Sequence, residues 1–303
     1  MRRALLASAM VTTLLTVAGC GENGRFPVAS APDLSTFGYP VTVAALTLDR
    51  RPERIVSLVP SATEMLFAID AGRQVVAVDE DSNYPTDAPK TGLSGLEPDV
   101  TAVAALRPDL VVISDDLGPA TAVLRRLKIP VLLTPPAATL NDTYRQIGQL
   151  GALTGHRPEA EALHRQMAGQ IAQVAEGVLP RARPLTYYYE LDPTLYTVTS
   201  RTFVGSIFKM LGLTSVADHV GPLGGSYPQL SPQGLIRSDP DMIFLADSMC
   251  CRQSAATVSV RPGWNVISAV RTGRIFLLDD DIASTWGPRT VDLVRTVAAA
   301  TRG

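Results

Sequence analysis

Short apolar runs alternate with helical patterns along most of this chain, and that alternation limits its fold more than any other feature. Ile55 to Val59 is a β-branched run, and Val75 to Val78 and Leu110 to Ile113 are further strand patterns with helical segments between them. Continuous apolar strands separated by helices are typical of a parallel sheet that is covered on both faces. We therefore expect an N-terminal α/β lobe over residues 41–156.

A long helix then interrupts the alternation. Two helical patterns follow one another without a strand, and the second begins at Pro158 and runs to about Val178. Proline suits the first turn of a helix, and a helix of this length makes a rod of roughly 30 Å. The alternation resumes afterwards, which predicts a C-terminal α/β lobe over residues 180–303.

Together these patterns predict an α/β fold with two Rossmann-like lobes, whose mainly parallel sheets are joined by one long backbone helix at residues 157–179. A chain of 303 residues that is 46% hydrophobic can bury a core in each lobe. We expect a ligand cleft between the lobes, because open α/β sheets bind ligands beyond the carboxyl ends of their strands.

The segment after the first strand has the pattern of a capping box. Ser61-Ala62-Thr63-Glu64 follows Pro60 and precedes an apolar helical stretch. In a capping box the Ser61 hydroxyl accepts the amide of residue 64, and the Glu64 carboxylate accepts the amide of residue 61. The pattern therefore predicts that both side chains cap the first helix.

The N-terminus has the features of a targeting signal. Two arginines precede a mostly apolar stretch, Ala4 to Val17, which is too short to span a bilayer comfortably. The run from Val17 to Cys20 resembles the bacterial lipoprotein box, which implies a signal peptide at residues 1–19 and lipidation of Cys20. Residues 20–40 contain this cysteine and a Gly-, Pro-, Ala- and Ser-rich stretch, which indicates a flexible tether.

The only other cysteines, Cys250 and Cys251, are adjacent. An oxidising compartment favours a possible disulfide between them, although a ring between neighbours needs a strained backbone. The alternative is two small buried side chains.

Composition and motifs argue against several functions. The formal charge is −2, without clusters of Lys and Arg, so nucleic acid is not an expected partner. The sequence lacks glycine-rich nucleotide loops and the G-x-S-x-G nucleophile motif, so we expect no enzyme activity and no catalytic residue. His156, His164 and His219 do not have ligand spacing, so we expect no bound metal ion and no cofactor.

Several ordered motifs together resemble the vitamin B12-binding protein family, which belongs to the helical-backbone class of ABC-transporter substrate-binding proteins. They are the segments Arg54–Glu64, Asn83–Pro85, Ala105–Val111, Tyr227–Ser231 and Gly287–Arg289, together with Tyr196-Thr197-Val198 followed by Phe203. The resemblance covers about residues 50–300. It implies two lobes that move little on binding and a bulky ligand held between aromatic surfaces.

Two sources supply the candidate ligand-binding residues. One is the resemblance, and the other is the set of segments that follow the carboxyl ends of the expected strands and should face the cleft. Tyr196 and Tyr227 match positions where the family places aromatic rings against the corrin, and Tyr84 and Trp286 follow strand ends. Large flat side chains bury much area against a flat ligand. The full set of candidates is Ser61, Tyr84, Tyr196, Tyr227, Met249 and Trp286.

The sequence departs from the family pattern at the positions that dock to the permease. The family carries a glutamate on each lobe, and the matching positions here are Thr101 and Gln233. Charge-assisted pairs with permease arginines are lost at both positions. The carboxylate of Glu97, Asp99 or Asp239 is a candidate to replace the missing glutamates.

We therefore expect a substrate-binding lipoprotein of an ABC importer, which captures a bulky metal chelate, most specifically cobalamin or another corrinoid. The alternative ligands are a ferric siderophore or haem. A further alternative, motivated by Thr101 and Gln233, is a stand-alone surface lipoprotein that acts as a scavenger or in envelope interactions. The expected partners are the chelate, an ABC permease/ATPase complex and the membrane, which a monomeric, extracytoplasmic protein contacts through its lipid anchor on Cys20.

Replacing Cys20 by Ser should release the protein from membranes, because the thiol that carries the lipid is lost. Membrane and soluble fractions of cells that make either form are compared by immunoblotting. Retention of the variant in the membrane fraction would reject the lipoprotein assignment.

Overall fold

A computed structural model describes residues 38–115, 117–178, 182–219 and 225–302. The expected signal peptide, the lipidation site Cys20 and most of the tether lie outside the described residues. No described helix combines the length and the apolar character that crossing a bilayer requires.

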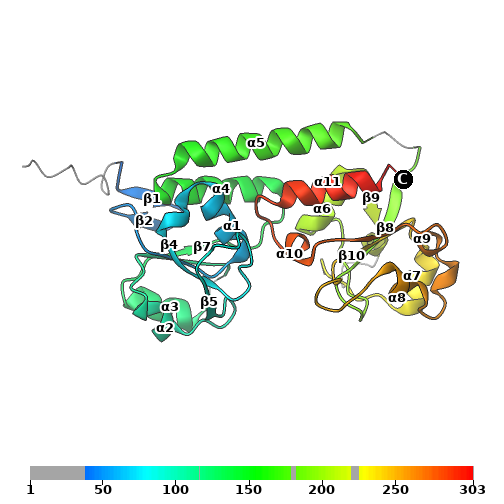
Figure 1. Ribbon diagram of the computed structural model, residues 1–303, viewed down its shortest axis with the longest axis horizontal. Helices are drawn as coiled ribbons and strands as arrows, with labels where there is room; N and C mark the ends of the chain where they lie inside the picture. Colours follow the sequence, from blue (N-terminus) through cyan, green and yellow to red (C-terminus); the bar gives the residue numbers. More distant parts are fainter. Residues whose placement is uncertain (1–37, 116, 179–181, 220–224, 303) are drawn as a thin grey trace, which may run out of the picture. The chain divides into compact units, whose positions relative to one another are not determined.

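The first sheet has five parallel strands in the order β5-β4-β3-β6-β7 (Figure 1). Apolar side chains fill both of its faces, so burial is continuous along β3 and β6 rather than alternating. A short antiparallel hairpin precedes it. The elements are β1 (Val41–Val43), β2 (Leu46–Leu48), β3 (Ile55–Ser57), α1 (Pro60–Ala68), η2 (Ala71–Gln74), β4 (Val75–Asp79), β5 (Lys90–Leu93), α2 (Val100–Ala105), β6 (Leu110–Ile113), α3 (Pro119–Arg126) and β7 (Val131–Leu133).

The second sheet has four parallel strands in the order β11-β10-β8-β9. Its elements are β8 (Leu185–Glu190), α6 (Phe203–Met210), β9 (Leu213–Ser215), η3 (Val216–His219), α7 (Pro232–Ser238), β10 (Met242–Leu245), α8 (Ala255–Ser259), η5 (Trp264–Val266), α9 (Ser268–Arg271), β11 (Ile275–Leu277), α10 (Asp280–Ala283) and α11 (Thr290–Ala300). Two parallel sheets flanked by helices confirm the predicted fold class.

A pair of helices connects the two sheets. α4 (Leu140–Thr154) ends at Gly155, whose φ of 78° is a left-handed value that suits glycine, and α5 (Arg157–Glu176) follows at once. The predicted start of the long helix at Pro158 is therefore correct to within one residue. Both α4 and α11 pack against α5 (Figure 1).

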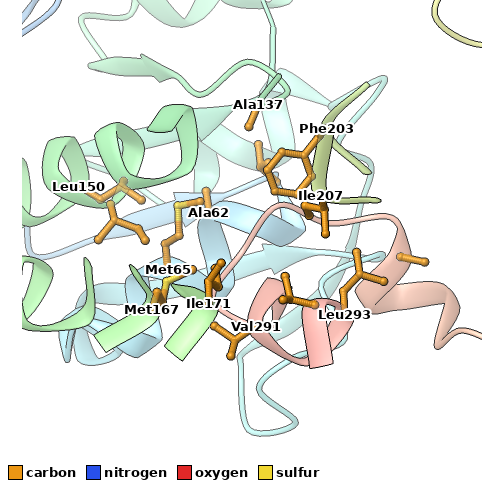
Figure 2. Packing of buried hydrophobic residues seen from close by; sticks show 14 of the residues in the cluster. Ala62, Met65, Ala137, Leu150, Met167, Ile171, Phe203, Ile207, Val291 and Leu293 are labelled. Atoms are coloured by element: carbon orange, nitrogen blue, oxygen red, sulfur yellow. The ribbon is translucent and has the colours of Figure 1, made fainter. Parts of the chain in front are cut away.

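One apolar core runs from the first sheet to the second along these helices. Figure 2 shows side chains from five helices converging in it: Ala62 and Met65 from α1, Leu150 from α4, Met167 and Ile171 from α5, Phe203 and Ile207 from α6, and Val291 and Leu293 from α11. Because protein interiors are close-packed, a change in the angle between the sheets would have to break these contacts.

The predicted capping box is wrong. α1 begins at Pro60 with Val59 as its N-cap, and no side chain caps it. Proline is favourable at the first helical position, so the helix starts two residues earlier than the motif suggests and Ser61 lies inside it. Ser61 and Glu64 instead contact residues that are more than 200 positions away in the chain.

These long-range contacts form an interlobe latch, defined here as Ser61, Glu64, Trp286 and Arg289. The backbone N–H of Trp286 donates to Ser61 Oγ at 3.0 Å, and Arg289 donates to Glu64 Oε1 from Nε at 2.9 Å and from Nη2 at 2.6 Å. Gly287 permits this approach, since a Cβ there would lie 2.5 Å from Glu64 Oε2. Burial raises the pKa of Glu64, and the Arg289 guanidinium opposes that shift.

Replacing Arg289 by Ala should lower the free energy of unfolding by about 3–5 kcal/mol, because Glu64 is only 3% exposed and would lose its partner. Arg295→Ala is the matched control, since Arg289 is the N-cap of α11 and Arg295 lies within that helix. Arg295 pairs with Asp292 and both are half-exposed, so its loss should cost less than about 1 kcal/mol. Urea unfolding at pH 7 measures both, and equal costs would contradict a structural role for the latch.

Candidate functional site

Two exposed tyrosines lie on neighbouring segments of chain near the second sheet. Tyr196 forms an isolated antiparallel bridge with Gln229, and the N–H of Thr197 donates to the Pro228 carbonyl at 3.0 Å. This register makes Tyr196 and Tyr227 diagonal neighbours on a two-stranded ribbon, a separation that aromatic side chains can bridge. Their side chains are 42% and 57% exposed. The run from Tyr196 to Thr199, whose composition favours a strand, forms only one bridge.

A sulfur-bearing turn, residues 248–251, follows the carboxyl end of β10. The carboxylate of Asp280 holds it by accepting the backbone N–H groups of Ser248 at 3.0 Å, Met249 at 2.8 Å and Cys250 at 3.0 Å. Three amides on one carboxylate fix the path of the backbone. The Met249 side chain is left 79% exposed.

The hydroxyl of Tyr189 belongs to the next-to-last residue of β8. This hydroxyl is fully buried and donates to the Ala283 carbonyl. Burial raises the pKa of Tyr189, and the nearby ionisable groups of Tyr187, Asp280 and Tyr227 raise it further.

Two fully buried carboxyls lie beneath the turn. The carboxylate of Glu190, the last residue of β8, accepts hydrogen bonds from Arg261 Nη1 at 2.6 Å and from Nη2 at 2.7 Å. Asp247 is equally buried, but neither of its carboxyl oxygens has a hydrogen-bond partner. Burial, and then the neighbouring Glu190 carboxylate, raise the pKa of Asp247 to about 7. One guanidinium cannot balance two carboxylates, so Asp247 holds its proton up to near neutrality.

The latch engages the other aromatic candidates. Ser61 is 1% exposed and accepts a hydrogen bond from Trp286, whose indole Nε1 also donates to Gln146 Oε1 at 2.8 Å. Tyr84 is 47% exposed and lies under the Arg289 guanidinium, which is 4.6 Å from the ring centre. Ser61 and Trp286 are therefore engaged within the latch. Tyr84, in contrast, keeps nearly half of its surface exposed to a ligand.

A polar cavity of about 340 Å³ adjoins the latch. Carboxylates outnumber the arginine along its wall, and the Thr285 hydroxyl in that wall is buried without a partner. Its lining residues are Pro60, Glu64, Asp81, Asn83, Tyr84, Asp281, Ser284, Thr285 and Arg289.

The predicted docking positions are exposed. Thr101 lies in the first turn of α2, where Asp99 caps the helix by accepting the Thr101 amide at 2.8 Å, and Gln233 lies in the first turn of α7. Asp239 accepts both the N–H and the hydroxyl of Ser268. The carboxylates of Asp99 and Asp239 thus already accept hydrogen bonds from the protein. Glu97, the third candidate, is exposed.

Cys250 and Cys251 are both free thiols, so the possible disulfide is not formed in this structure. Cys250 is exposed and Cys251 is partly buried, which also excludes the alternative of two buried side chains. The neighbouring Cys251 thiol, and then burial, raise the pKa of Cys250 to about 12. Within the part of the chain that the structure describes, no three His, Cys, Asp or Glu residues are grouped so that they could hold a metal ion.

Sequence analysis missed the Glu64–Arg289 pair and the cluster of Glu190, Asp247 and Arg261. Arg289 stands in a quoted motif, but its partner was assigned to a cap. Asp247 comes two residues after the apolar run Met242–Leu245, which has the pattern of a strand and is a usable signal. Arg261 lies in irregular chain, where no periodicity indicates which way a side chain points.

Comparison with known proteins gives consistent matches. The family model described as periplasmic binding protein matches residues 55–282. A cobalamin-binding protein of Halobacterium salinarum is 31% identical and the match covers 91% of this chain and 74% of that protein. An uncharacterised ABC transporter substrate-binding lipoprotein of Bacillus subtilis, YvrC, is 28% identical, with 98% of this chain and 96% of that one covered.

Solved structures match the fold. The vitamin B12-binding protein BtuF of Vibrio cholerae superposes with a TM-score of 0.69 at 23% identity, and covers 83% of this chain and 97% of its own. The haem-binding protein RhuT of Roseiflexus sp. RS-1 has a TM-score of 0.72 at 24% identity, with 82% and 97% covered. Both likenesses are below 25% identity and concern the fold alone.

Replacing Asp247 by Asn should flatten the pH dependence of stability. Because the folded pKa is raised from 3.8 to about 7, the folded state binds more protons than the unfolded state between these values, and wild-type stability falls as pH rises from about 4 through 7. Asn cannot ionise, so the variant should lose that part of the slope. Urea midpoints at pH 4, 6 and 8 measure it, with the exposed Asp292→Asn as a control that keeps the wild-type slope. Parallel curves for wild type and Asp247→Asn would contradict the assignment.

Proposed function

The chain belongs to the periplasmic binding protein family, and from this membership we propose that it captures a corrinoid outside the cytoplasm and delivers it to an ABC importer. It is an ABC-transporter substrate-binding protein of the class that includes vitamin B12, haem and iron-chelate binders. Proteins of this family are extracytoplasmic, and the relatives and structural neighbours above are binding proteins. The relative that supports a corrinoid most directly is the cobalamin-binding protein at 31% identity over 91% of this chain.

The paired tyrosines are the observation that carries the proposal. Tyr196 and Tyr227 are exposed on paired segments at the carboxyl edge of the second sheet, where ligands bind in open α/β folds. Aromatic side chains bury about 150–250 Å² each and present flat surfaces. A bulky planar macrocycle gains more from two such rings than a small or globular ligand would.

Membrane attachment is part of the proposal. Cys20 would carry the lipid, and the tether would hold the described lobes near the membrane. The lipoprotein named YvrC, matched over 98% of this chain, supports this anchoring. Delivery to a permease would rely on contacts other than carboxylates at Thr101 and Gln233, and exposed Glu97 supplies a carboxylate close to the first of these positions.

Ligand identity is tested by titration of the purified protein with cyanocobalamin, haemin and a ferric siderophore, followed by absorbance and by intrinsic fluorescence. Saturable binding of cyanocobalamin at micromolar concentration or below is the expected result. Saturation with haemin or the siderophore alone would replace the corrinoid as the ligand.

Transport is tested separately by uptake of labelled cobalamin in cells that lack this protein. The importer role predicts reduced uptake. Tight binding with normal uptake would favour the stand-alone scavenger.

Replacing Tyr227 by Ala should weaken binding by about 2 kcal/mol, roughly 30-fold in Kd, because an aromatic anchor is removed from the ligand surface. Leu127→Ala is the matched control, since Leu127 is a 53% exposed apolar residue on the first lobe that is not a ligand candidate. Fluorescence titration measures both variants. An unchanged Kd for Tyr227→Ala would remove this tyrosine from the site.

A further inference from the structure

A groove of about 630 Å³ lies beside β7, the edge strand of the first sheet. The described residues that line it include two cations, Arg125 and Lys128, but no Asp or Glu. Most of the remaining wall is apolar and comes from β7 and from the tip of the β1–β2 hairpin, residues 43–47. A groove with apolar walls and only positive charge suits a partner that is both anionic and apolar.

The end of α3 holds the two cations in position. The N–H of Lys128 donates to the Arg125 carbonyl at 3.0 Å. The N–H of Ile129 donates to the Leu124 carbonyl at 3.0 Å, which completes the hydrogen-bond pattern of a Schellman C-cap. Lys128 takes the left-handed position of this cap, with a φ of 59°. Glycine would adopt that conformation at lower cost, so a charged side chain stands here against the preference of the backbone.

A largely exposed leucine lies among the cations. Arg125, Arg126 and Lys128 are exposed, and Leu127 between them is 53% exposed. This basic group is smaller than the surfaces that bind nucleic acid. An apolar side chain among cations is typical of a surface that contacts lipid, because the apolar group can enter the acyl region while the cations meet phosphates.

The described chain begins next to this groove. It starts at Gly38 and enters the hairpin at Val41, and the tip of that hairpin forms part of the groove wall. The residues before Gly38 are those that would lead to a lipid on Cys20. Such an anchor keeps a membrane within reach of the groove, which favours a membrane over an acidic protein as the occupant.

We propose that this headgroup surface, defined as the groove and residues 125–128, binds anionic phospholipid headgroups of the membrane. The proposal rests on the membrane attachment proposed above and adds a second contact to it. Each Lys or Arg strengthens binding to an anionic membrane only about fivefold. So small a patch is effective beside a lipid anchor, which supplies a high local concentration of lipid.

The headgroup surface and the ligand-facing edge lie at opposite edges of the first sheet. α3 connects the parallel strands β6 and β7, so its last turn lies at their amino edge. Thr101, in the first turn of α2, lies at the carboxyl edge because α2 begins after β5. Contact with headgroups therefore turns the ligand-facing edge away from the membrane for capture, and docking on a permease requires release of this contact.

The test uses full-length protein, purified from expressing cells in detergent and reconstituted into vesicles with brominated acyl chains, which quench nearby tryptophan. One set of vesicles contains phosphatidylcholine alone, and the other also contains phosphatidylglycerol. Leu127→Trp places a reporter in the headgroup surface. Val266→Trp is its matched control, since Val266 is 54% exposed and lies in the second lobe. Relative to wild type, Leu127→Trp should be quenched in the anionic vesicles and recover at high salt, whereas Val266→Trp should respond equally in both sets.

Charge variants are compared in the Leu127→Trp protein. Arg126→Gln with Lys128→Gln should lower the ratio of bound to unbound protein about 30-fold and abolish the quenching, because two cations are lost from the contact. Arg145→Gln with Arg165→Gln removes the same charge from side chains that are 59% and 72% exposed on α4 and α5. This control pair should keep the quenching.

Flotation of the vesicles separates this inference from the lipid anchor. If the protein floats with both kinds of vesicle but Leu127→Trp is quenched no more than Val266→Trp, or equally in both lipids, the headgroup contact is overturned and the anchor stands. Quenching that survives the loss of Arg126 and Lys128 also overturns it. Protein that floats only with anionic vesicles supports the headgroup surface and refutes the anchor, and protein that floats with neither refutes both.

Discussion

Burial of one continuous apolar core beneath α4, α5 and α11 is the constraint on which the rest of the structure depends. Met65, Met167 and Val291 come from three distant parts of the sequence and pack in it together. Because this core excludes water, the Glu64 carboxylate next to it requires a charged partner, and Arg289 supplies one. The same packing opposes changes in the angle between the two sheets, as the family resemblance implies for this class of binding protein.

Local sequence patterns predicted the elements whose stability is local or repetitive. The strands at Ile55 and Leu110 were predictable because apolar residues fill both of their faces, and Gly155 indicated the end of α4 because its left-handed φ is costly for other residues. The capping box failed for a physical reason. Ser61 and Glu64 fit a cap equally well, and only contacts with Trp286 and Arg289, made more than 200 residues later, decide against it.

The candidate site was partly predictable. Tyr196 and Tyr227 were identified by family resemblance, but their adjacency depends on a bridge between two irregular segments, which has no periodic signal. Asp247 and Arg261 meet beside Glu190 through irregular segments as well, and these too have no periodic signal.

The two lobes also differ in which side chains they expose. In the first lobe Ser61 is enclosed by the latch, whereas the second exposes two tyrosines and a sulfur-bearing turn. Ligand recognition should therefore depend more on the second lobe.

The attachment of residues 248–250 to Asp280 decides which positions of this loop can be substituted without changing its backbone. Asp280 holds this loop through three main-chain amides and the Ser248 hydroxyl, and these hydrogen bonds do not involve the side chains of Met249 and Cys250. Substituents at positions 249 and 250 can consequently be exchanged while the scaffold stays the same.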